Sequence, residues 1–139
     1  MRYTVNKSGA KFERFVDIVR ELRSEKGCPW DREQSPASLK RYLLEETQEL
    51  LEAIDAGDQQ HIKEELGDLL YLIILLAQFH DEKDVFAIGD VIDAISAKMV
   101  RRHPHVFNDE KIGSAAELRQ KWLEIKNREK ADRIGPKKN

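Results

Sequence analysis

Apolar residues recur along this chain at the spacing of an α-helix, in segments separated by glycine, proline and short polar stretches. In the first segment, over about 11–26, they stand three or four positions apart, from Phe12 to Leu22. No segment alternates between apolar and polar residues as a strand does. The pattern therefore predicts an all-α protein, an antiparallel bundle of about five helices that oligomerises through its helical core. The other four helices are predicted over about 35–56, 58–79, 90–102 and from 114 onward.

Capping residues mark the two central helices. Ser35 followed by Pro36 is typical of a helix start, because serine accepts a bond from a free backbone N–H and proline suits the first turn. Gly57 ends this helix and Asp58 begins the next. A turn this short makes the two helices antiparallel neighbours.

The remaining segments are less regular. Residues 27–34 have no period and predict an ordered loop, whereas Ser114 and Glu117 predict a capping box at the start of the last helix. Pro104 ends the helix before it. The length fits a single domain, 1–139, with frayed ends over about 1–10 and 131–139.

Composition narrows the classes of function. The chain has 24 Lys and Arg against 26 Asp and Glu, so no basic field predicts nucleic-acid binding. Cys28 is the single cysteine, which excludes an intrachain disulfide and a multi-thiolate zinc site and fits a reducing cytoplasm. The longest apolar run, Leu69–Ala77, is far shorter than the roughly 20 residues that span a bilayer. We therefore expect a cytoplasmic protein without a membrane partner.

Two acidic pairs lie on the apolar sides of the central helices. Glu46 and Glu49 share one helix face, and Glu65 and Asp68 share another. The spacing alone is weak, since Glu49 and Glu52 repeat it, and surface charges remain an alternative. Buried, clustered carboxylates are costly without a cation. Because the ligands are all oxygens, the pattern predicts a site for Mg²⁺ or Mn²⁺.

Several cationic and aromatic residues have two possible roles. Lys98 and Arg102 fall on the apolar side of their helix, where they would form salt bridges or bind phosphate oxygens. Trp122 and Lys126 stand one turn apart, and the pattern alone favours a core tryptophan and a solvated lysine. Trp30 either stacks on a base or holds its loop.

Five blocks of sequence, in a fixed order along the chain, form a recognisable set. They are Leu22-Arg23 with Gly27-Cys28-Pro29-Trp30-Asp31, Leu44-Glu45-Glu46 with Glu49, Glu64-Glu65-Leu66-Gly67-Asp68-Leu69-Leu70, Arg101-Arg102-His103-Pro104-His105-Val106-Phe107, and Trp122-Leu123-Glu124-Ile125-Lys126. Together they resemble the MazG family of all-α nucleoside triphosphate pyrophosphohydrolases, over roughly residues 12–130. They look most like the amino-terminal domain of members that carry two such domains in tandem.

The resemblance implies a role for each matching residue. In the family the two acidic pairs hold magnesium, which here implies Glu46, Glu49, Glu65 and Asp68. The family's nucleotide-binding elements fall on Lys98, Arg102, Trp122 and Lys126, and Trp30 is a further candidate for the base.

The implied reaction is magnesium-dependent hydrolysis of a nucleoside triphosphate to the monophosphate and pyrophosphate, as nucleotide-pool house-cleaning. Water attacks the α-phosphorus, and Lys98 and Arg102 stabilise the charge that develops. Glu46 or the neighbouring Glu45 is expected to orient this water or take its proton.

The segment Leu69–Ala77 is apolar around its whole circumference, which predicts a homo-oligomer, most simply a dimer, joined near this helix. The resemblance implies the same pairing. Two alternatives remain: a related dUTP or phosphoribosyl-ATP pyrophosphohydrolase, or a catalytically weak helical module that oligomerises or binds a partner.

Overall fold

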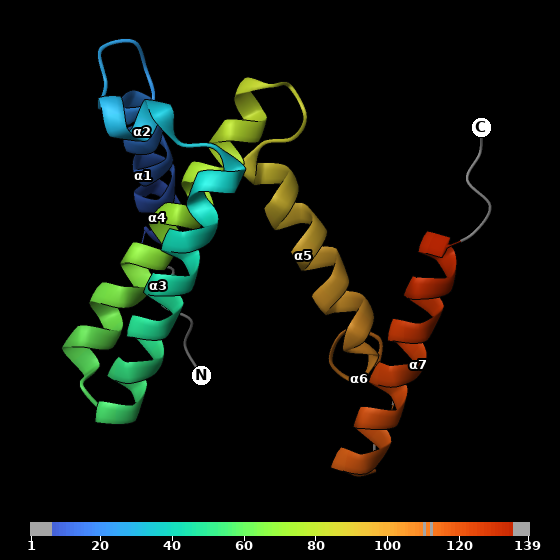
Figure 1. Ribbon diagram of the computed structural model, residues 1–139. Helices are drawn as coiled ribbons and strands as arrows, with labels where there is room; N and C mark the ends of the chain where they lie inside the picture. Colours follow the sequence, from blue (N-terminus) through green and yellow to red (C-terminus); the bar gives the residue numbers. More distant parts are fainter. Residues whose placement is uncertain (1–6, 110, 112, 135–139) are drawn as a thin grey trace. The chain divides into compact units, whose positions relative to one another are not determined.

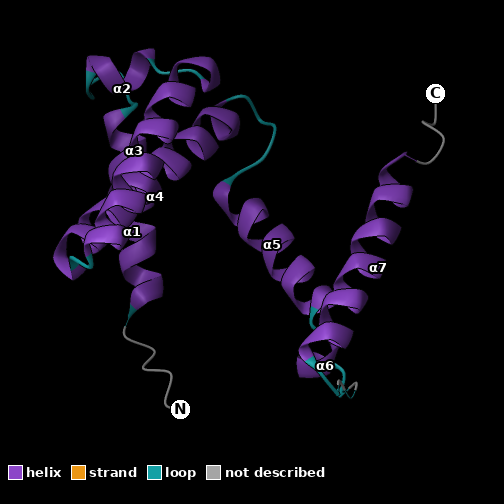
Figure 2. Cartoon of the chain, turned by 60° about the horizontal axis from the view of Figure 1, so that its bottom comes forward, coloured by secondary structure: helices purple, strands orange, loops and turns teal. Residues whose placement is uncertain are grey.

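The computed structural model describes residues 7–109, 111 and 113–134 (Figures 1 and 2). Over this part of the chain it contains seven helices and no strand, so the all-α prediction is confirmed. Two of the seven, α2 and α6, are short helices that the apolar pattern did not predict. The helices are α1 (Ser8–Leu22), α2 (Pro29–Glu33), α3 (Pro36–Ala56), α4 (Gln59–Glu82), α5 (Ile88–Arg102), α6 (Pro104–Phe107) and α7 (Ala115–Ile134).

The chain divides into two compact units, Met1–Val91 and Ile92–Asn139. The first contains α1 to α4 and the start of α5, and the second contains the rest of α5 with α6 and α7. A helix with the length and apolar character needed to cross a bilayer is absent from the described residues.

Residues 8–10 and 131–134, which fall in the predicted frayed ends, are helical, whereas 1–6 and 135–139 lie outside the described residues. At the first end the Lys11 N–H already donates to the Lys7 carbonyl, which closes a first turn. At the other end, Arg101 and Arg102 form salt bridges with Glu129 of the last helix. The helix then continues beyond Glu129 through residues that mostly favour helix formation.

Local caps build the α3–α4 hairpin as predicted. The Ser38 N–H donates to Ser35 Oγ, and the Ser35 N–H donates to Ser38 Oγ, so the capping box is made of two serines. Gly57 closes α3 with a φ of 67°, a left-handed conformation that glycine adopts without strain. Asp58 then caps α4 by accepting a bond from the His61 N–H. The two helices pack along their length as an antiparallel pair (Figure 1).

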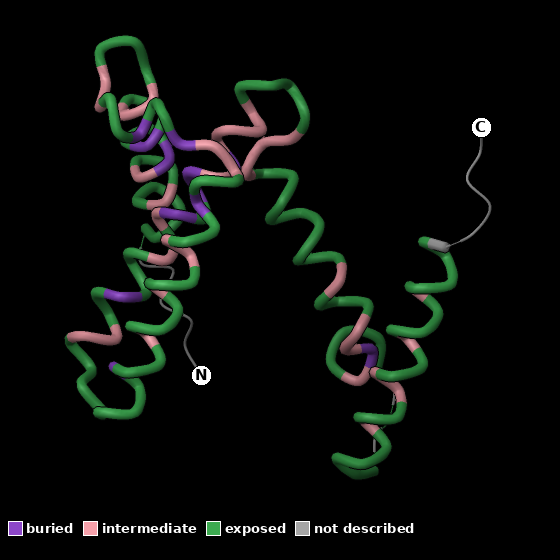
Figure 3. The backbone as a smooth tube through the Cα atoms, viewed as in Figure 1, coloured by how far each residue is buried: buried purple, intermediate pink, exposed green. Residues whose placement is uncertain are grey.

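The core of the first unit lies where α1 meets this hairpin (Figure 3). Its fully buried members come from three helices, and partly buried aromatic and aliphatic side chains surround them. Burial of apolar surface here is the main favourable contribution to folding. The buried members are Val16, Val19, Leu39, Leu72, Ile74 and Leu75.

The segment between α1 and α3 differs from its prediction in two ways. The first helix ends at Leu22, not near 26, because the Cys28 N–H donates to the Leu22 carbonyl and draws the chain across the helix end. Gly27 passes so close that a Cβ there would collide with this carbonyl. The predicted loop contains α2, which begins with Pro29 in its first turn.

A partly buried polar network anchors α2 to the end of α1 and to α4. The guanidinium of Arg23 binds both carboxylate oxygens of Glu82 at 2.8 Å and donates to the carbonyls of Asp31 and Gln34 at 2.6 and 3.2 Å. The hydroxyl of Tyr71 donates to the carboxylate of Asp31, which is buried. Burial and this bond raise the pKa of Tyr71. One arginine and one tyrosine thus hold the loop.

The second unit has little buried surface. Among its described residues Pro104 is buried, whereas α5 has no buried residue (Figure 3). Pro104 follows the end of α5, as predicted, and also begins α6, because proline suits the first turn of a helix. The last helix, α7, starts with the predicted cap, in which the Glu117 N–H donates to Ser114 Oγ.

We expect the Tyr71→Phe substitution to lower the free energy of unfolding by about 1–3 kcal/mol, because it leaves the buried Asp31 carboxylate without its hydroxyl partner. Urea denaturation followed by circular dichroism measures this change. The matched control is Tyr42→Phe, which removes a hydroxyl that Arg41 binds at the exposed surface. The control should stay within about 0.5 kcal/mol of wild type. Equal losses in the two variants would contradict the proposed anchoring.

Candidate functional site

Three carboxylates from α3 and α4 converge in the first unit. One oxygen each from Glu46, Glu49 and Glu65 lies within 4.8 Å of the others. Glu65 is buried, with 6% of its surface exposed, and Glu46 is half-buried, whereas Glu49 is exposed. The helical period therefore placed two of the three on the buried side and overstated the burial of Glu49.

The hairpin explains why these residues meet. Glu49 stands eight residues before Gly57 and Glu65 seven residues after Asp58, counted along the sequence. At 1.5 Å per residue both lie roughly 11 Å from the turn. Glu46 lies one turn before Glu49 on α3, further from the hairpin turn, and on the same helix face.

Close packing of like charges changes the protonation of this cluster. Burial, a hydrogen bond to Glu65 and the negative charges of Glu49 and Asp68 raise the pKa of Glu46 to about 8. The hydrogen bond from Glu46, together with one from His61, lowers the pKa of Glu65. Without a cation, Glu46 therefore keeps a proton at neutral pH and shares it with Glu65.

Asp68 and Glu45 lie differently from these three residues. Asp68 is exposed, so its predicted place on the buried side of the helix is wrong. Partial desolvation of its carboxyl and the charges of Glu65 and Glu64 raise its pKa. Glu45 lies outside the cluster, because its carboxylate is exposed and stands 3.9 Å from the guanidinium of Arg41.

The donor atoms fit a divalent cation. Glu46 Oε2 and Glu65 Oε2 are buried and have no hydrogen-bond partner among the described residues. A buried carboxylate oxygen without a partner is costly unless a cation or a proton neutralises it. All the cluster's ligands are hard oxygen atoms, which Mg²⁺ and Mn²⁺ prefer.

A histidine that the sequence reasoning missed contacts this cluster. His61 Nε2 lies 3.0 Å from Glu65 Oε1, and the two residues are one turn apart on α4. The spacing of four residues was the available signal, since it puts both side chains on one face. Many histidine–glutamate pairs share this spacing, so the signal carried little weight by itself.

The predicted nucleotide-binding cations lie in the second unit. Arg102 binds the carboxylate of Glu129 at 2.8 Å, and Arg101 binds the same carboxylate at 2.6 Å. Hydrogen bonds from Arg102 and Arg101 lower the pKa of Glu129 to about 2. The salt-bridge alternative is therefore realised for Arg102, although its Nε is buried without a partner among the described residues. Lys98 is half-buried and Lys126 is exposed.

The two tryptophans have different surroundings within their units. Trp122 is half-buried, contacts the ring of His103 edge-on at 5.6 Å, and has an Nε1 without a partner in the described chain. Trp30 is 40% exposed, packs edge-on against Tyr42 at 5.3 Å, and its carbonyl accepts a bond from Gln34. Trp30 thus lies in α2, packs against Tyr42 of α3, and presents part of its ring to solvent.

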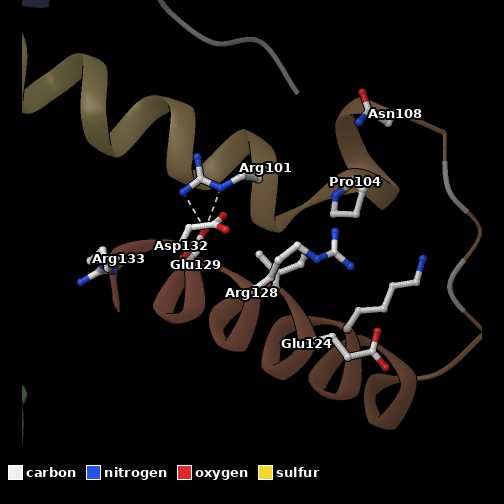
Figure 4. Close-up of a pocket in the computed structure, with 10 residues that line it drawn as sticks. Arg101, Pro104, Asn108, Glu124, Arg128, Glu129, Asp132 and Arg133 are labelled. Atoms are coloured by element: carbon white, nitrogen blue, oxygen red, sulfur yellow. Dashed lines mark hydrogen bonds and ion pairs between the residues drawn. The ribbon is translucent and has the colours of Figure 1, made fainter. Parts of the chain in front are cut away.

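A pocket of about 680 Å³ lies within the second unit, between α7 and the end of α5 with α6 (Figure 4). Figure 4 shows Arg101 reaching from α5 to Glu129 on α7. The pocket's described lining includes none of the predicted nucleotide-binding residues. The lining consists of Arg101, Pro104, Asn108, Lys121, Glu124, Ile125, Arg128, Glu129, Asp132 and Arg133.

A protein-family model matches the part of the chain that contains the acidic cluster. The model of the MazG nucleotide pyrophosphohydrolase domain matches residues 34–107, which is more than half of the chain. The chain belongs to the MazG family. The matched region includes the four predicted metal ligands as well as Lys98 and Arg102, whereas Trp30, Trp122 and Lys126 lie outside it.

Individual MazG relatives are similar over most of this chain. The uncharacterized protein YabN of Bacillus subtilis (strain 168) is 51% identical over 120 residues, 86% of this chain and 24% of that protein. The nucleoside triphosphate pyrophosphohydrolase/pyrophosphatase MazG of Thermotoga maritima is 44% identical over 135 residues, 94% of this chain and 51% of that protein. The chain thus spans about a quarter and about half of these relatives.

A solved structure shows the same fold. The crystal structure of a MazG-related protein from Thermotoga maritima matches with a TM-score of 0.69 and 33% identity. The match covers 83% of this chain and 98% of that one. The all-α prediction and the family resemblance are therefore both confirmed.

We expect the metal-free MazG chain to lose stability as the pH rises through about 8. The Glu46 carboxyl has an ordinary pKa of 4.5, which rises to about 8 in the fold, so the folded state binds a proton that the unfolded state has released. This contribution is complete below pH 4.5 and is lost as the pH rises through about 8. Urea denaturation in EDTA across this range measures it.

The Glu46→Gln variant is the control, because its amide does not titrate. Its free energy of unfolding should fall less over the same pH range, and added Mg²⁺ should also reduce the fall in the wild type. Identical pH slopes for wild type and variant would refute this account of the cluster.

Proposed function

We propose that this chain hydrolyses nucleoside triphosphates to the monophosphate and pyrophosphate, at the α–β phosphoanhydride bond, with Mg²⁺ as cofactor. The observation that carries the proposal is the convergence of Glu46, Glu49 and Glu65 with two buried, unpartnered carboxylate oxygens. Membership of the MazG family supports the reaction, and the relative from Thermotoga maritima carries the name of this activity.

Charge explains why the site needs a cation. A triphosphate and a carboxylate cluster are both anionic, so they repel one another unless a cation lies between them. Magnesium held by these carboxylates would supply positive charge and would make a nearby water more acidic. Mn²⁺ prefers similar ligands and would substitute for it.

The chain's own residues complete the proposed mechanism. Glu46 takes the proton of the water that attacks the α-phosphorus, and pyrophosphate leaves with the electrons of the broken P–O bond. The exposure of Glu45 beside Arg41 supports Glu46 over Glu45 in this role. Asp68 joins the three clustered residues as the fourth metal ligand.

The second unit supplies the proposed contacts to the nucleotide. From the family resemblance, Lys98 and Arg102 bind phosphate oxygens, and Trp122 and Lys126 bind the rest of the nucleotide. The Nε of Arg102 and the Nε1 of Trp122 support this, since both are buried donors without a hydrogen-bond partner among the described residues. Trp30 is a further candidate for the base.

The family match at 34–107 runs across the division between Val91 and Ile92, so it includes residues of both units. The physiological role that we propose is house-cleaning of the nucleotide pool in the cytoplasm.

We expect the purified protein with Mg²⁺ to release pyrophosphate and a nucleoside monophosphate from triphosphates of several bases. Chromatography of the products identifies them, and EDTA should stop the reaction. The substrate panel includes dUTP and phosphoribosyl-ATP, because exclusive turnover of either would favour that related activity instead. Release of orthophosphate and a diphosphate would refute attack at the α-phosphorus, and no turnover of any substrate would favour a non-catalytic module.

Matched variants connect this activity to the acidic cluster. Glu49→Ala should lower kcat/KM by more than about 100-fold, since a bound metal contributes several kcal/mol to the transition state. Glu52→Ala is the control, because Glu52 lies one turn further along α3, exposed, and contacts Gln48. Both variants should keep wild-type helicity by circular dichroism.

A second copy of this chain is the proposed partner. On α4, Leu66, Leu70 and Ile73 are exposed and lie on one helix face at spacings of four and three residues. An exposed apolar stripe of this kind on a globular unit marks an interaction surface. On α3, Leu44 and Leu51 are likewise exposed. Pairing of the helical cores would cover these side chains, as the family resemblance implies.

We expect sedimentation across a dilution series to detect a homo-oligomer, most simply a dimer. Ile73→Glu should shift the equilibrium toward the monomer, because it places a charge in the apolar stripe. Val85→Glu is the control, since Val85 is exposed in the loop after α4 and lies outside the stripe. A wild-type protein that stays monomeric and active at every concentration would overturn the proposal.

A further inference from the structure

His61 lies between the cap of α4 and the acidic cluster. Its backbone N–H donates to Asp58 Oδ1 at 3.1 Å, so the helix cap holds the backbone of His61 in place. Its ring nitrogen Nε2 lies 3.0 Å from Glu65 Oε1. The imidazole is 41% exposed, whereas the Glu65 side chain is 8% exposed. The ring therefore has one side in solvent and one nitrogen on a buried carboxylate.

The two carboxylate oxygens of Glu65 have different surroundings. Oε1 accepts the hydrogen bond from His61, whereas Oε2 is buried without a partner among the described residues. A carboxylate with one oxygen held in this way has little freedom to rotate. Metal-ligating carboxylates are commonly hydrogen-bonded by such a neighbour, and its removal typically weakens metal affinity about 10- to 100-fold.

The helix alone gives no reason for a histidine at this position. Asp58 already caps α4, so the ring is not needed for the cap. A cation in the first turn of a helix opposes the helix dipole, so a charged imidazole gains no stability from this position. The contact with Glu65 is the interaction that the side chain makes.

We propose that His61 is a positioning residue for the metal centre: its Nε2–H holds Glu65 Oε1 and thereby presents the other oxygen to the cation. This proposal rests on the proposed function, in which Glu65 binds a divalent metal. The donor is the same in the neutral Nε2–H tautomer and in the imidazolium, so the contact does not depend on the charge of His61. His61 touches neither the cation nor the substrate in this arrangement.

The test measures the affinity of the full chain for Mn²⁺ alone, by electron paramagnetic resonance of the free ion. His61→Ala should weaken binding about 10- to 100-fold, the usual effect of removing a neighbour that orients a ligand. His61→Gln should bind close to wild type, because its amide N–H replaces the imidazole donor. Gln60→Ala, a change at the neighbouring exposed residue of the same helical turn, should have no effect.

Three results would overturn the proposal, and they are distinguishable. Unchanged Mn²⁺ affinity in His61→Ala, with tight binding by wild type, removes the role of His61 and leaves the metal centre standing. Equal weakening in the alanine and glutamine variants shows that hydrogen-bond donation is not the relevant property. Failure of wild type to bind Mn²⁺ removes the metal centre and this role with it. Circular dichroism and urea denaturation establish that each variant is folded.

Discussion

Repulsion among the carboxylates of Glu46, Glu49 and Glu65 is the constraint around which the first unit is built. Two of these groups are withdrawn from solvent, where like charges interact more strongly than in water. Burial, a hydrogen bond to Glu65 and the nearby negative charges raise the pKa of Glu46 to about 8, so the metal-free cluster retains a proton. A divalent cation would neutralise two charges where a proton neutralises one, and the unpartnered oxygens of Glu46 and Glu65 could help to hold it.

The rest of the unit holds the two helices together against this repulsion. The hairpin caps at Gly57 and Asp58 set the register of α3 and α4. Apolar packing against α1, centred on Leu72 and Leu75, provides the favourable free energy. The Arg23 network then anchors α2, which carries Trp30, across the end of α1.

In the second unit, by contrast, two cationic side chains surround a single carboxylate. Arg101 and Arg102 both bind Glu129, and their hydrogen bonds lower its pKa to about 2. An arginine tied in this way is oriented, and it retains donors for an anionic ligand. If Arg102 binds phosphate, as we propose, a phosphate oxygen would add to or replace its contact with Glu129. The salt-bridge and phosphate-binding interpretations are then successive states of one side chain.

The sequence by itself determined the features that depend on neighbours within one helical turn. The caps at Ser35, Gly57 and Asp58 act over three or four residues, so residue type and spacing were enough to locate the hairpin. The helical period also placed Glu46 and Glu65 on the buried side, because burial follows the apolar face.

The tertiary structure decided what depends on residues far apart in the chain. The early end of α1 and the start of α2 follow from contacts of Gly27 and Cys28 with the helix end, and the Tyr71–Asp31 bond joins residues 40 positions apart. The partner of Arg102 is likewise 27 positions away. Helical spacing says which face a side chain occupies, but not which side chain of another element meets it there. That depends on how the helices pack, which local preferences do not determine.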